Sequence, residues 1–158
     1  MTKECKQQFT LRITQANKTE MIVILYEMLL SYLEDAKEEL AAGEILTYRA
    51  SLKRVRGCIE ELIASLNLEY ELASNLLSLY LFCNRELIKA DVRKKAEHLL
   101  HIESVISKLL EAYKELAKQD QSGPVMQNSQ TVYAGLTYGR DSLTEDLSDQ
   151  GMNRGFRA

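Results

Sequence analysis

The chain has 158 residues, of which 46% are hydrophobic, and its formal net charge is only −3. That length suits one domain and a tail, and the weak charge argues against a protein drawn to nucleic acid or to an anionic membrane. No apolar run approaches the roughly 18 residues that a membrane-spanning helix needs. Because the polar N-terminus also lacks the apolar core of a signal peptide, we expect a cytosolic protein without stable membrane insertion.

Long periodic segments interrupted by a single proline, Pro124, favour an all-α fold. The three cysteines are odd in number and show no CxxC spacing. Cys58 and Cys83 lie in apolar helical stripes, where a free thiol behaves as a small hydrophobic side chain. We therefore expect no redox or metal role for them.

Residues 1–16 show no sustained helical period. Phe9, Leu11 and Ile13 alternate with polar residues, which predicts an extended N-terminal arm that lays these side chains against a groove. A frayed, disordered terminus is the alternative.

The first predicted helix begins after Asn17, because Asn17 and Glu20 have the spacing of a capping box. It runs to about Ala42, where Gly43 is suited to a left-handed C-terminal position. Residues 21–30 are apolar almost all round, so this half is expected to be buried between two partners or to carry an exposed apolar patch.

The second predicted helix covers residues 45–66 and the third runs from a tight junction at residues 67–68 to about residue 91. The second carries a heptad seam typical of a left-handed bundle. Its members are Tyr48, Leu52, Val55, Ile59, Leu62 and Leu66. The third helix has two apolar stripes and should therefore lie between partners. The stripes are Leu72, Leu76, Leu79, Cys83 and Leu87 on one face, and Leu77, Leu81 and Ile88 on another.

The fourth predicted helix covers residues 92–118, with the charge run 93–95 in its first turn. Its seam is Leu99, Ile102, Ile106, Leu109, Tyr113 and Leu116. Four helices with short links predict an antiparallel four-helix bundle over residues 17–118. Basic residues beside the second seam, Lys53, Arg54 and Arg56, suit a solvated flank or a face for an acidic partner.

Residues 119–158 are rich in Gly, Ser, Asn and Gln, and this composition predicts a largely disordered C-terminal tail. Scattered apolar side chains in the tail suit a segment that folds on binding, and a plain spacer is the alternative. They are Val132, Tyr133, Leu136, Tyr138, Leu143, Leu147, Met152 and Phe156.

The chain carries no pattern typical of catalysis. A di-iron site in a four-helix bundle needs a Glu-x-x-His on each of two helices, but the two histidines, His98 and His101, lie on one predicted helix. A surface metal site with Glu97 is conceivable, yet two solvated histidines are the expectation. Phosphate-binding and nucleophile motifs are absent from the sequence. We expect no enzyme, cofactor or metal, and the apolar surplus points to a surface that binds amphipathic helices.

The centre of the chain resembles the flagellin-specific export chaperone FliS. The resemblance rests on Leu66-Asn67-x-Glu69-Tyr70-Glu71, Asn75-Leu76-x-x-Leu79-Tyr80 and Arg85-x-Leu87-Ile88-x-Ala90, and extends to residues 16–21, to Ile24-Leu25-Tyr26, and to Glu103, Ile106, Leu109 and Tyr113. The chain departs from the family pattern at the first cap, which is Asn17-Lys18 in place of Ser-Pro, and at Tyr113, which replaces a tryptophan. Phe9 stands where tyrosine is common, and the tail exceeds the family's compact core.

This resemblance implies a cytosolic chaperone that binds the C-terminal segment of flagellin, prevents its premature polymerisation and delivers it to the export gate of the flagellar type III secretion system. For the groove it suggests two sets of residues, Ile22, Leu25, Tyr26 and Leu29 from the first helix and Leu72, Leu76, Leu79 and Tyr80 from the third. Phe9, Leu11 and Ile13 are assigned to an arm that covers this groove. The alternative is a homodimeric structural or adaptor bundle that uses the same apolar surface for self-association.

Overall fold

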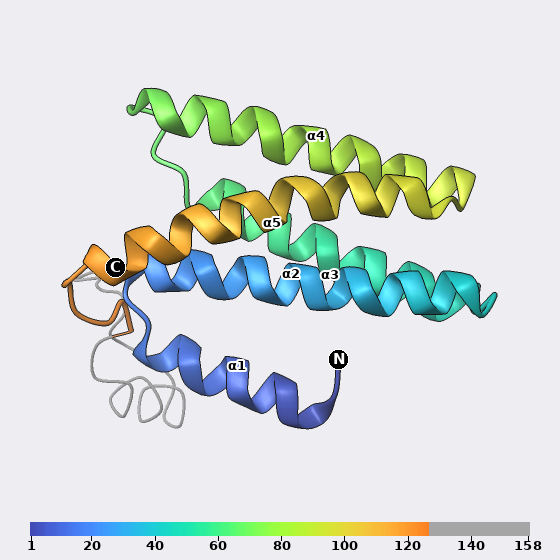
Figure 1. The fold of residues 1–158 in the computed structure, drawn as a ribbon, viewed down its shortest axis with the longest axis horizontal. Helices are drawn as coiled ribbons and strands as arrows, with labels where there is room; N and C mark the ends of the chain where they lie inside the picture. The colour runs from blue at the N-terminus through green and yellow to red at the C-terminus, as the bar shows by residue number, and fades with distance from the viewer. Residues whose placement is uncertain (127–158) are drawn as a thin grey trace, which may run out of the picture. The chain divides into compact units, whose positions relative to one another are not determined.

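The computed structural model describes residues 1–126, and in this part of the chain all regular structure is helical (Figure 1). The prediction of an all-α fold is confirmed for these residues. Within this range no helix is long and apolar enough to cross a membrane. The five helices are α1 (Lys3–Gln15), α2 (Lys18–Ala41), α3 (Ile45–Ala64), α4 (Glu71–Arg93) and α5 (Ala96–Gln119).

The N-terminal segment is a helix, so the prediction of an extended arm was wrong. Thr2 caps α1 through a hydrogen bond that its side chain accepts from the Cys5 amide. The alternation that suggested an extended arm does not match the burial, because Phe9 is 8% exposed whereas Leu11 is 61% exposed. The apolar residues that pack are instead spaced four apart. Cys5, Phe9 and Ile13 share one face of α1 and pack in the cluster that contains Ile24 of α2.

The start of α2 follows its local sequence. The Asn17 side chain accepts a hydrogen bond from the Glu20 amide, while the Glu20 carboxylate accepts one from the Asn17 amide. This is the predicted capping box. At the other end Gly43 has a φ of +77°, which only glycine adopts without strain, so the predicted left-handed position after α2 is also confirmed.

The links on either side of α4 differ from those expected. Residues 65–70 form a six-residue connection rather than a tight junction, because the Asn67 side chain accepts a hydrogen bond from the Glu69 amide and favours a turn. At the other end α4 continues to Arg93 and Lys94 adopts a left-handed conformation. Arg93 therefore stands in the last turn of α4, where the helix dipole favours a cation, and not in the first turn of α5.

Helices α2 to α5 form one packed unit around a common core. Helix α2 packs against α3 and α5, and α4 packs against the same two helices, while α1 packs on α2. In Figure 1 the chain reverses direction at each connection from α2 to α5. The largest fully buried side chains come from all four of these helices. They are Ile24, Tyr26, Leu29 and Leu33 of α2, Tyr48, Ile59 and Leu62 of α3, Tyr80 and Leu87 of α4, and Leu99, Ile102 and Ile106 of α5.

The two predicted heptad seams are buried to different extents. The α3 seam is buried from Tyr48 to Leu62. The α5 seam is buried only in its first half, since Tyr113 is partly exposed and Leu116 is exposed. On α4 the second stripe is open as well, because Leu81 and Ile88 are exposed rather than held between partners. Apolar side chains thus remain uncovered on α4 and on the second half of α5.

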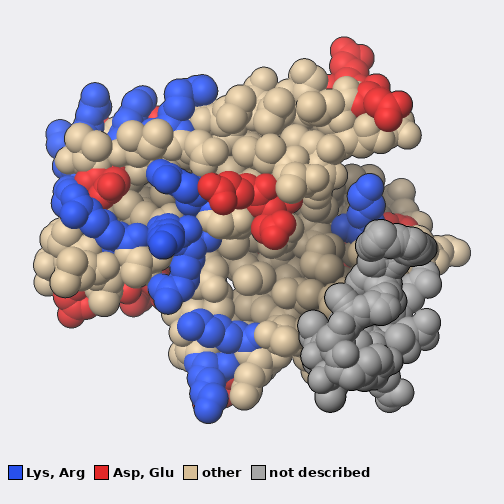
Figure 2. Space-filling view, turned by 180° about the vertical axis from the view of Figure 1, so that it is seen from behind, with Lys and Arg blue, Asp and Glu red and all other residues tan. Residues whose placement is uncertain are grey.

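Charged side chains are spread over the outside of the helices. Lys53, Arg54 and Arg56 on α3 are exposed. Figure 2 shows one face of the molecule, on which basic side chains gather towards one end with acidic side chains among them, and a broad area carries neither.

Most of the predicted tail lies beyond residue 126, so the apolar side chains named for it fall outside the described residues. The first part of the tail, residues 120–125, is described. There Asp120 accepts a hydrogen bond from the Thr19 hydroxyl, and the Val125 amide donates to the Ala16 carbonyl.

Candidate protein-binding groove

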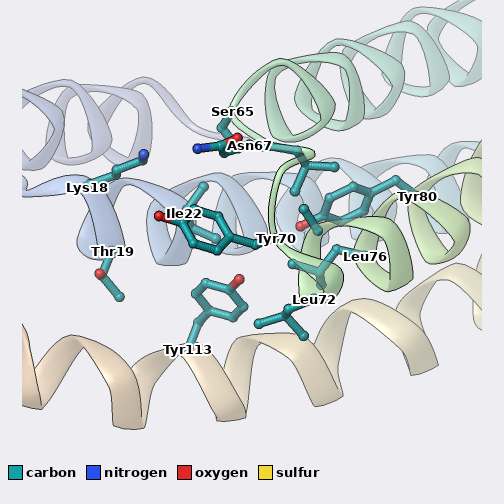
Figure 3. A pocket seen from close by; sticks show the side chains of 12 residues that line it. Lys18, Thr19, Ile22, Ser65, Asn67, Tyr70, Leu72, Leu76, Tyr80 and Tyr113 are labelled. Carbon is teal, nitrogen blue, oxygen red and sulfur yellow. The ribbon is translucent and has the colours of Figure 1, made fainter.

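A groove with a cavity of about 380 Å³ opens between the first turns of α2, the 65–70 connection, the start of α4 and the second half of α5 (Figure 3). Six residues separate α3 from α4, and in Figure 1 the first turns of α4 diverge from the end of α5. Leu72 of α4 and Leu116 of α5 are exposed in this region. The lining residues are Lys18, Thr19, Ile22, Ser65, Leu66, Asn67, Tyr70, Leu72, Ala73, Leu76, Tyr80 and Tyr113.

Tyr80 and Tyr113 line the base of the groove, and a third tyrosine, Tyr26, lies directly beneath them in the core. The hydroxyls of Tyr26 and Tyr80 lie 2.6 Å apart and share a buried hydrogen bond that joins α2 to α4. The Tyr113 ring of α5 meets the Tyr26 ring edge-on, with centroids 5.5 Å apart. Burial is the main cause that raises the pKa of Tyr80 to about 12, and burial together with the hydrogen bond that it donates to Tyr80 raises the pKa of Tyr26. The base is therefore uncharged at neutral pH.

The walls of the groove carry apolar side chains that are open to solvent. Leu72 is 60% exposed, and Tyr70 beside it on the connection is also exposed. Leu76, one turn further along α4, is buried and continues the apolar surface inward. Polar groups lie at the rim, where Lys18 and Thr19 of α2 stand opposite Asn67. An apolar strip with a polar rim suits the apolar face of an amphipathic segment.

The structure brings together half of the residues suggested for the groove. Ile22, Leu72, Leu76 and Tyr80 line it. The other four suggested residues do not line this cavity. Tyr26 and Leu29 are completely buried in the core, Leu25 is partly buried against the core, and Leu79 is exposed on α4.

Sequence reasoning missed Tyr70 and Tyr113 as lining residues. Tyr113 was placed on a buried seam, and only the packing of α5 shows that the second half of this seam is uncovered. Tyr70 was assumed to be helical, but it is the N-terminal cap residue of α4. The apolar character of the stretch was visible in the sequence, whereas the open side was not.

The suggested covering arm lies elsewhere in this conformation. Phe9 and Ile13 pack in the cluster that contains Ile24 of α2, and none of Phe9, Leu11 and Ile13 lines the groove. Arg12 of α1 donates hydrogen bonds from its guanidinium to the Glu27 carboxylate of α2, with the shorter at 2.7 Å. These contacts hold α1 on another face of α2 than the face that carries Ile22.

The histidines also differ from expectation. His98 is only 4% exposed and lies at hydrogen-bonding distance from the Glu86 carboxylate, so the prediction of two solvated histidines was wrong for His98. His101 remains exposed but contacts the same carboxylate.

The sequence matches the family model of the flagellar protein FliS over residues 1–120. This match covers most of the chain, including all five helices described above. The chain belongs to the FliS family. A comparison with curated proteins finds no match.

FliS is a family of flagellar export chaperones and not of enzymes. Membership agrees with a site that offers apolar surface. The all-helical fold is consistent with this assignment. The groove between α2, α4 and α5 is the candidate site for the chaperone's client.

Proposed function

We propose that this FliS-family protein is a cytosolic export chaperone that binds the C-terminal segment of flagellin in the groove. Binding covers the apolar face through which flagellin polymerises, and the complex is delivered to the export gate of the flagellar type III secretion apparatus. In this proposal residues 17–118 act as an antiparallel four-helix bundle, residues 1–16 as an accessory N-terminal segment, and residues 119–158 as a flexible tail.

The observation that carries the proposal is the exposure of Leu72 directly beside the buried Leu76 and the tyrosine base. A leucine that is 60% exposed at the mouth of an apolar groove loses hydration when a partner covers it. An amphipathic helix offers apolar side chains at intervals of three and four residues, and these match the spacing of Leu72, Leu76 and Leu79 along α4.

We assign the client contacts to Ile22, Leu72, Leu76 and Leu79, with Tyr70 and Tyr113 at the edges. Tyr26, Leu29 and Tyr80 support these residues from within the core. Leu25 is assigned to the boundary between the two sets. A groove-covering role for Phe9, Leu11 and Ile13 requires that α1 first separates from α2.

The test is isothermal titration of the full chain with a peptide of the flagellin C-terminal segment. We expect one-to-one binding with a large negative heat-capacity change, because apolar surface is buried on both partners. The control is the same peptide with its apolar face replaced by serine, which should not bind. Equal binding of both peptides, or binding of neither, would contradict the proposal.

A homodimeric structural or adaptor bundle is the second candidate, and the exposed Leu72 and Tyr70 are what favour it. A dimer whose groove serves only self-association does not bind the flagellin peptide, whereas in a chaperone the peptide occupies the groove and displaces any second copy. Light scattering with and without the peptide separates the two candidates, because an adaptor dimer stays dimeric at saturating peptide and a chaperone does not.

A further inference from the structure

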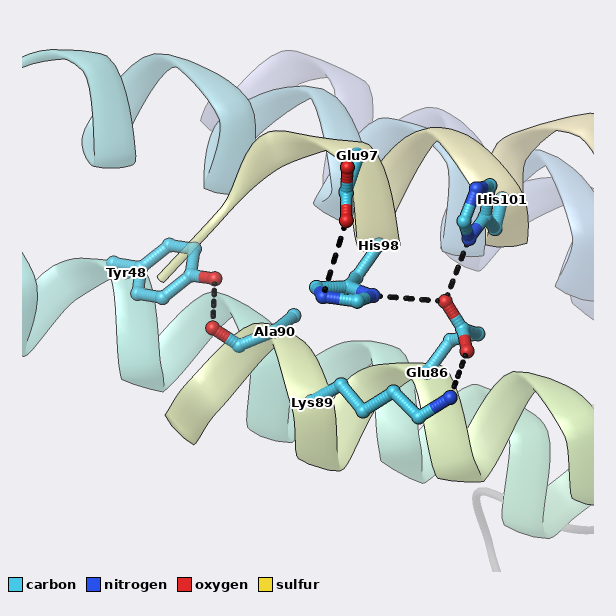
Figure 4. A network of polar contacts seen from close by, with 7 residues as sticks. All are labelled: Tyr48, Glu86, Lys89, Ala90, Glu97, His98 and His101. Carbon is cyan, nitrogen blue, oxygen red and sulfur yellow. Dashed lines mark hydrogen bonds and ion pairs between the residues drawn. The ribbon is translucent and has the colours of Figure 1, made fainter. Parts of the chain in front are cut away.

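A cluster of three side chains lies between α4 and α5, away from the groove (Figure 4). Glu86 is four turns along α4 from Leu72, about 20 Å at 1.5 Å per residue. Its Oε1 atom is 3.0 Å from Nδ1 of His98 and 2.7 Å from Nδ1 of His101, two residues one turn apart on α5. One carboxylate oxygen thus meets two imidazole nitrogens from the neighbouring helix.

The geometry of these three groups is that of a metal-ligand set. Their ligand atoms all lie within 4.8 Å of one another. The rings of His98 and His101 stand at 83° to each other, so their Nδ1 atoms converge on one point from two directions. Ligands about 2.0–2.1 Å from a tetrahedral Zn²⁺ ion are a little over 3 Å apart, close to the 3.0 and 2.7 Å that separate Oε1 of Glu86 from the two Nδ1 atoms.

The second oxygen of Glu86 is held by Lys89, whose Nζ lies 3.0 Å from Oε2. The Lys89 ammonium pairs with this carboxylate, so Glu86 is present as the anion and Oε1 is the ligand atom that faces the histidines.

A buried nitrogen of His98 supplies an independent indication. Because the ionised carboxylate only accepts hydrogen bonds, Nδ1 of His98 must carry the proton in the contact with Glu86. In neutral His98, Nε2 is then left as an acceptor, and this atom is buried without a hydrogen-bond partner. The Glu97 carboxylate lies 3.8 Å from Nε2 and is an acceptor as well.

A metal ion at Nδ1 removes this mismatch. The proton of neutral His98 then resides on Nε2, which faces the Glu97 carboxylate. Metal-bound histidines commonly donate their second ring N–H to a carboxylate, and this outer contact orients the ring. His101 is exposed, so an ion reaches the site from solvent and keeps a water ligand there.

We propose that Glu86, His98 and His101 bind a divalent transition-metal ion of the Zn²⁺ class, with Glu97 as the outer-shell partner of His98. Two imidazoles and one carboxylate suit Zn²⁺ better than the oxygen-seeking Mg²⁺ or Ca²⁺. The ion would join α4 to α5 at the end of the helix pair that lies away from the groove.

The first test is titration of the metal-stripped full chain with Zn²⁺, followed by calorimetry and by NMR of the imidazole nitrogens. The chain has only two histidines, so their nitrogen signals are simple to assign. We expect one tight site and loss of the Nδ1-bound proton on both rings. An unchanged pair of rings at saturating Zn²⁺ would overturn the proposal.

Variants test the ligand set. His101→Gln removes an exposed ligand and should leave helical circular dichroism unchanged, while Zn²⁺ affinity falls at least tenfold. Glu97→Gln should lower the affinity about 10- to 100-fold, as loss of an outer-shell carboxylate does. Equal affinity of wild type and His101→Gln would contradict the site.

Co²⁺ in place of Zn²⁺ separates this site from binding by cysteine. A nitrogen and oxygen site gives visible d–d bands without intense sulfur-to-metal charge transfer. Cys5→Ser is the matched control, because Cys5 is the one cysteine of the chain that is not buried. Charge transfer in wild type that disappears in Cys5→Ser, with no d–d bands left, would assign the metal to the thiol and overturn the proposal.

Discussion

Tyr26 of α2 and Tyr80 of α4 share one hydrogen bond, with 2.6 Å between their hydroxyl oxygens, beneath the floor of the groove. Both side chains are almost completely buried, so each hydroxyl depends on the other for its hydrogen bond. The pair joins two helices whose backbones pack mainly against α3 and α5. The groove is thus underlaid by a polar link inside an apolar core.

Removing one hydroxyl should cost more than removing both. We expect Tyr80→Phe to lower the free energy of unfolding by about 1–3 kcal/mol, because the Tyr26 hydroxyl is left buried without a partner. The double variant Tyr26→Phe/Tyr80→Phe should be no less stable than the single one. Urea denaturation measures both, and Tyr70→Phe at an exposed position is the control. Additive losses from the two substitutions would contradict this coupling.

The same pair predicts a loss of stability in alkali. An unfolded tyrosine has a pKa near 10, whereas burial raises the pKa of Tyr80 to about 12 and also raises that of Tyr26. The folded state therefore holds these protons more tightly. The stabilising contribution is complete below pH 10 and is lost as the pH rises towards 12 and beyond. Urea denaturation at pH 9, 10 and 11 should show a steeper loss for wild type than for the double phenylalanine variant. Parallel curves would show that these tyrosines do not carry the effect.

The mouth of the groove should be sensitive to charge. On the proposed function, Leu72→Glu abolishes binding of the flagellin peptide while helical circular dichroism and thermal stability stay close to wild type. Leu81→Glu is the matched control, because Leu81 is 43% exposed on another face of α4. If Leu81→Glu lost binding and Leu72→Glu kept it, the client would lie on the second stripe and not in the groove.

The attachment of α1 should depend on Phe9 and not on Leu11. Phe9→Ala removes a buried ring from the cluster with Ala16 and Ile24, so α1 should detach and residues 1–16 should become accessible to protease. The control Leu11→Ala, at a position that is 61% exposed, should leave the cleavage rate unchanged. Limited proteolysis followed by mass spectrometry measures the two rates. A similar rate for both variants would mean that α1 is held by contacts other than Phe9.

The cap of α2 should contribute more than an ordinary surface residue. Asn17→Ala removes the capping contact with the Glu20 amide, and it also removes hydrogen bonds that Asn17 donates to the Asp120 and Ser122 carbonyls at 3.4 Å. We expect a loss of about 1–2 kcal/mol in the free energy of unfolding. Lys18→Ala, one residue along and exposed, is the control. A loss below 0.5 kcal/mol, the range of ordinary surface substitutions, would show that the cap is not needed in the folded chain.

Much of the helical core could be read from residue spacing. The capping box at Asn17 and the left-handed glycine after α2 depend on residues within a few positions of one another, and the seam of α3 follows a heptad spacing along one helix. In these places the local preference and the tertiary structure agree, as is usual in natural sequences. The N-terminal segment could not be predicted in this way. Its apolar residues fit both an alternating spacing and a spacing of four residues, and the packing of α1 against Ile24 of α2 favours the helix.

By itself, the sequence determined which stretches are helical cores and that the central stretch carries more apolar surface than one neighbour could cover. The tertiary structure alone decided which of these apolar side chains stay open. Leu72 and Leu76 read alike in the sequence, yet one is exposed and the other buried, at the place where the first turns of α4 diverge from the end of α5 in Figure 1. The cluster of Glu86, His98 and His101 likewise exists only after α4 and α5 pack. Burial depends on what stands opposite a side chain, and residues distant in the chain supply that.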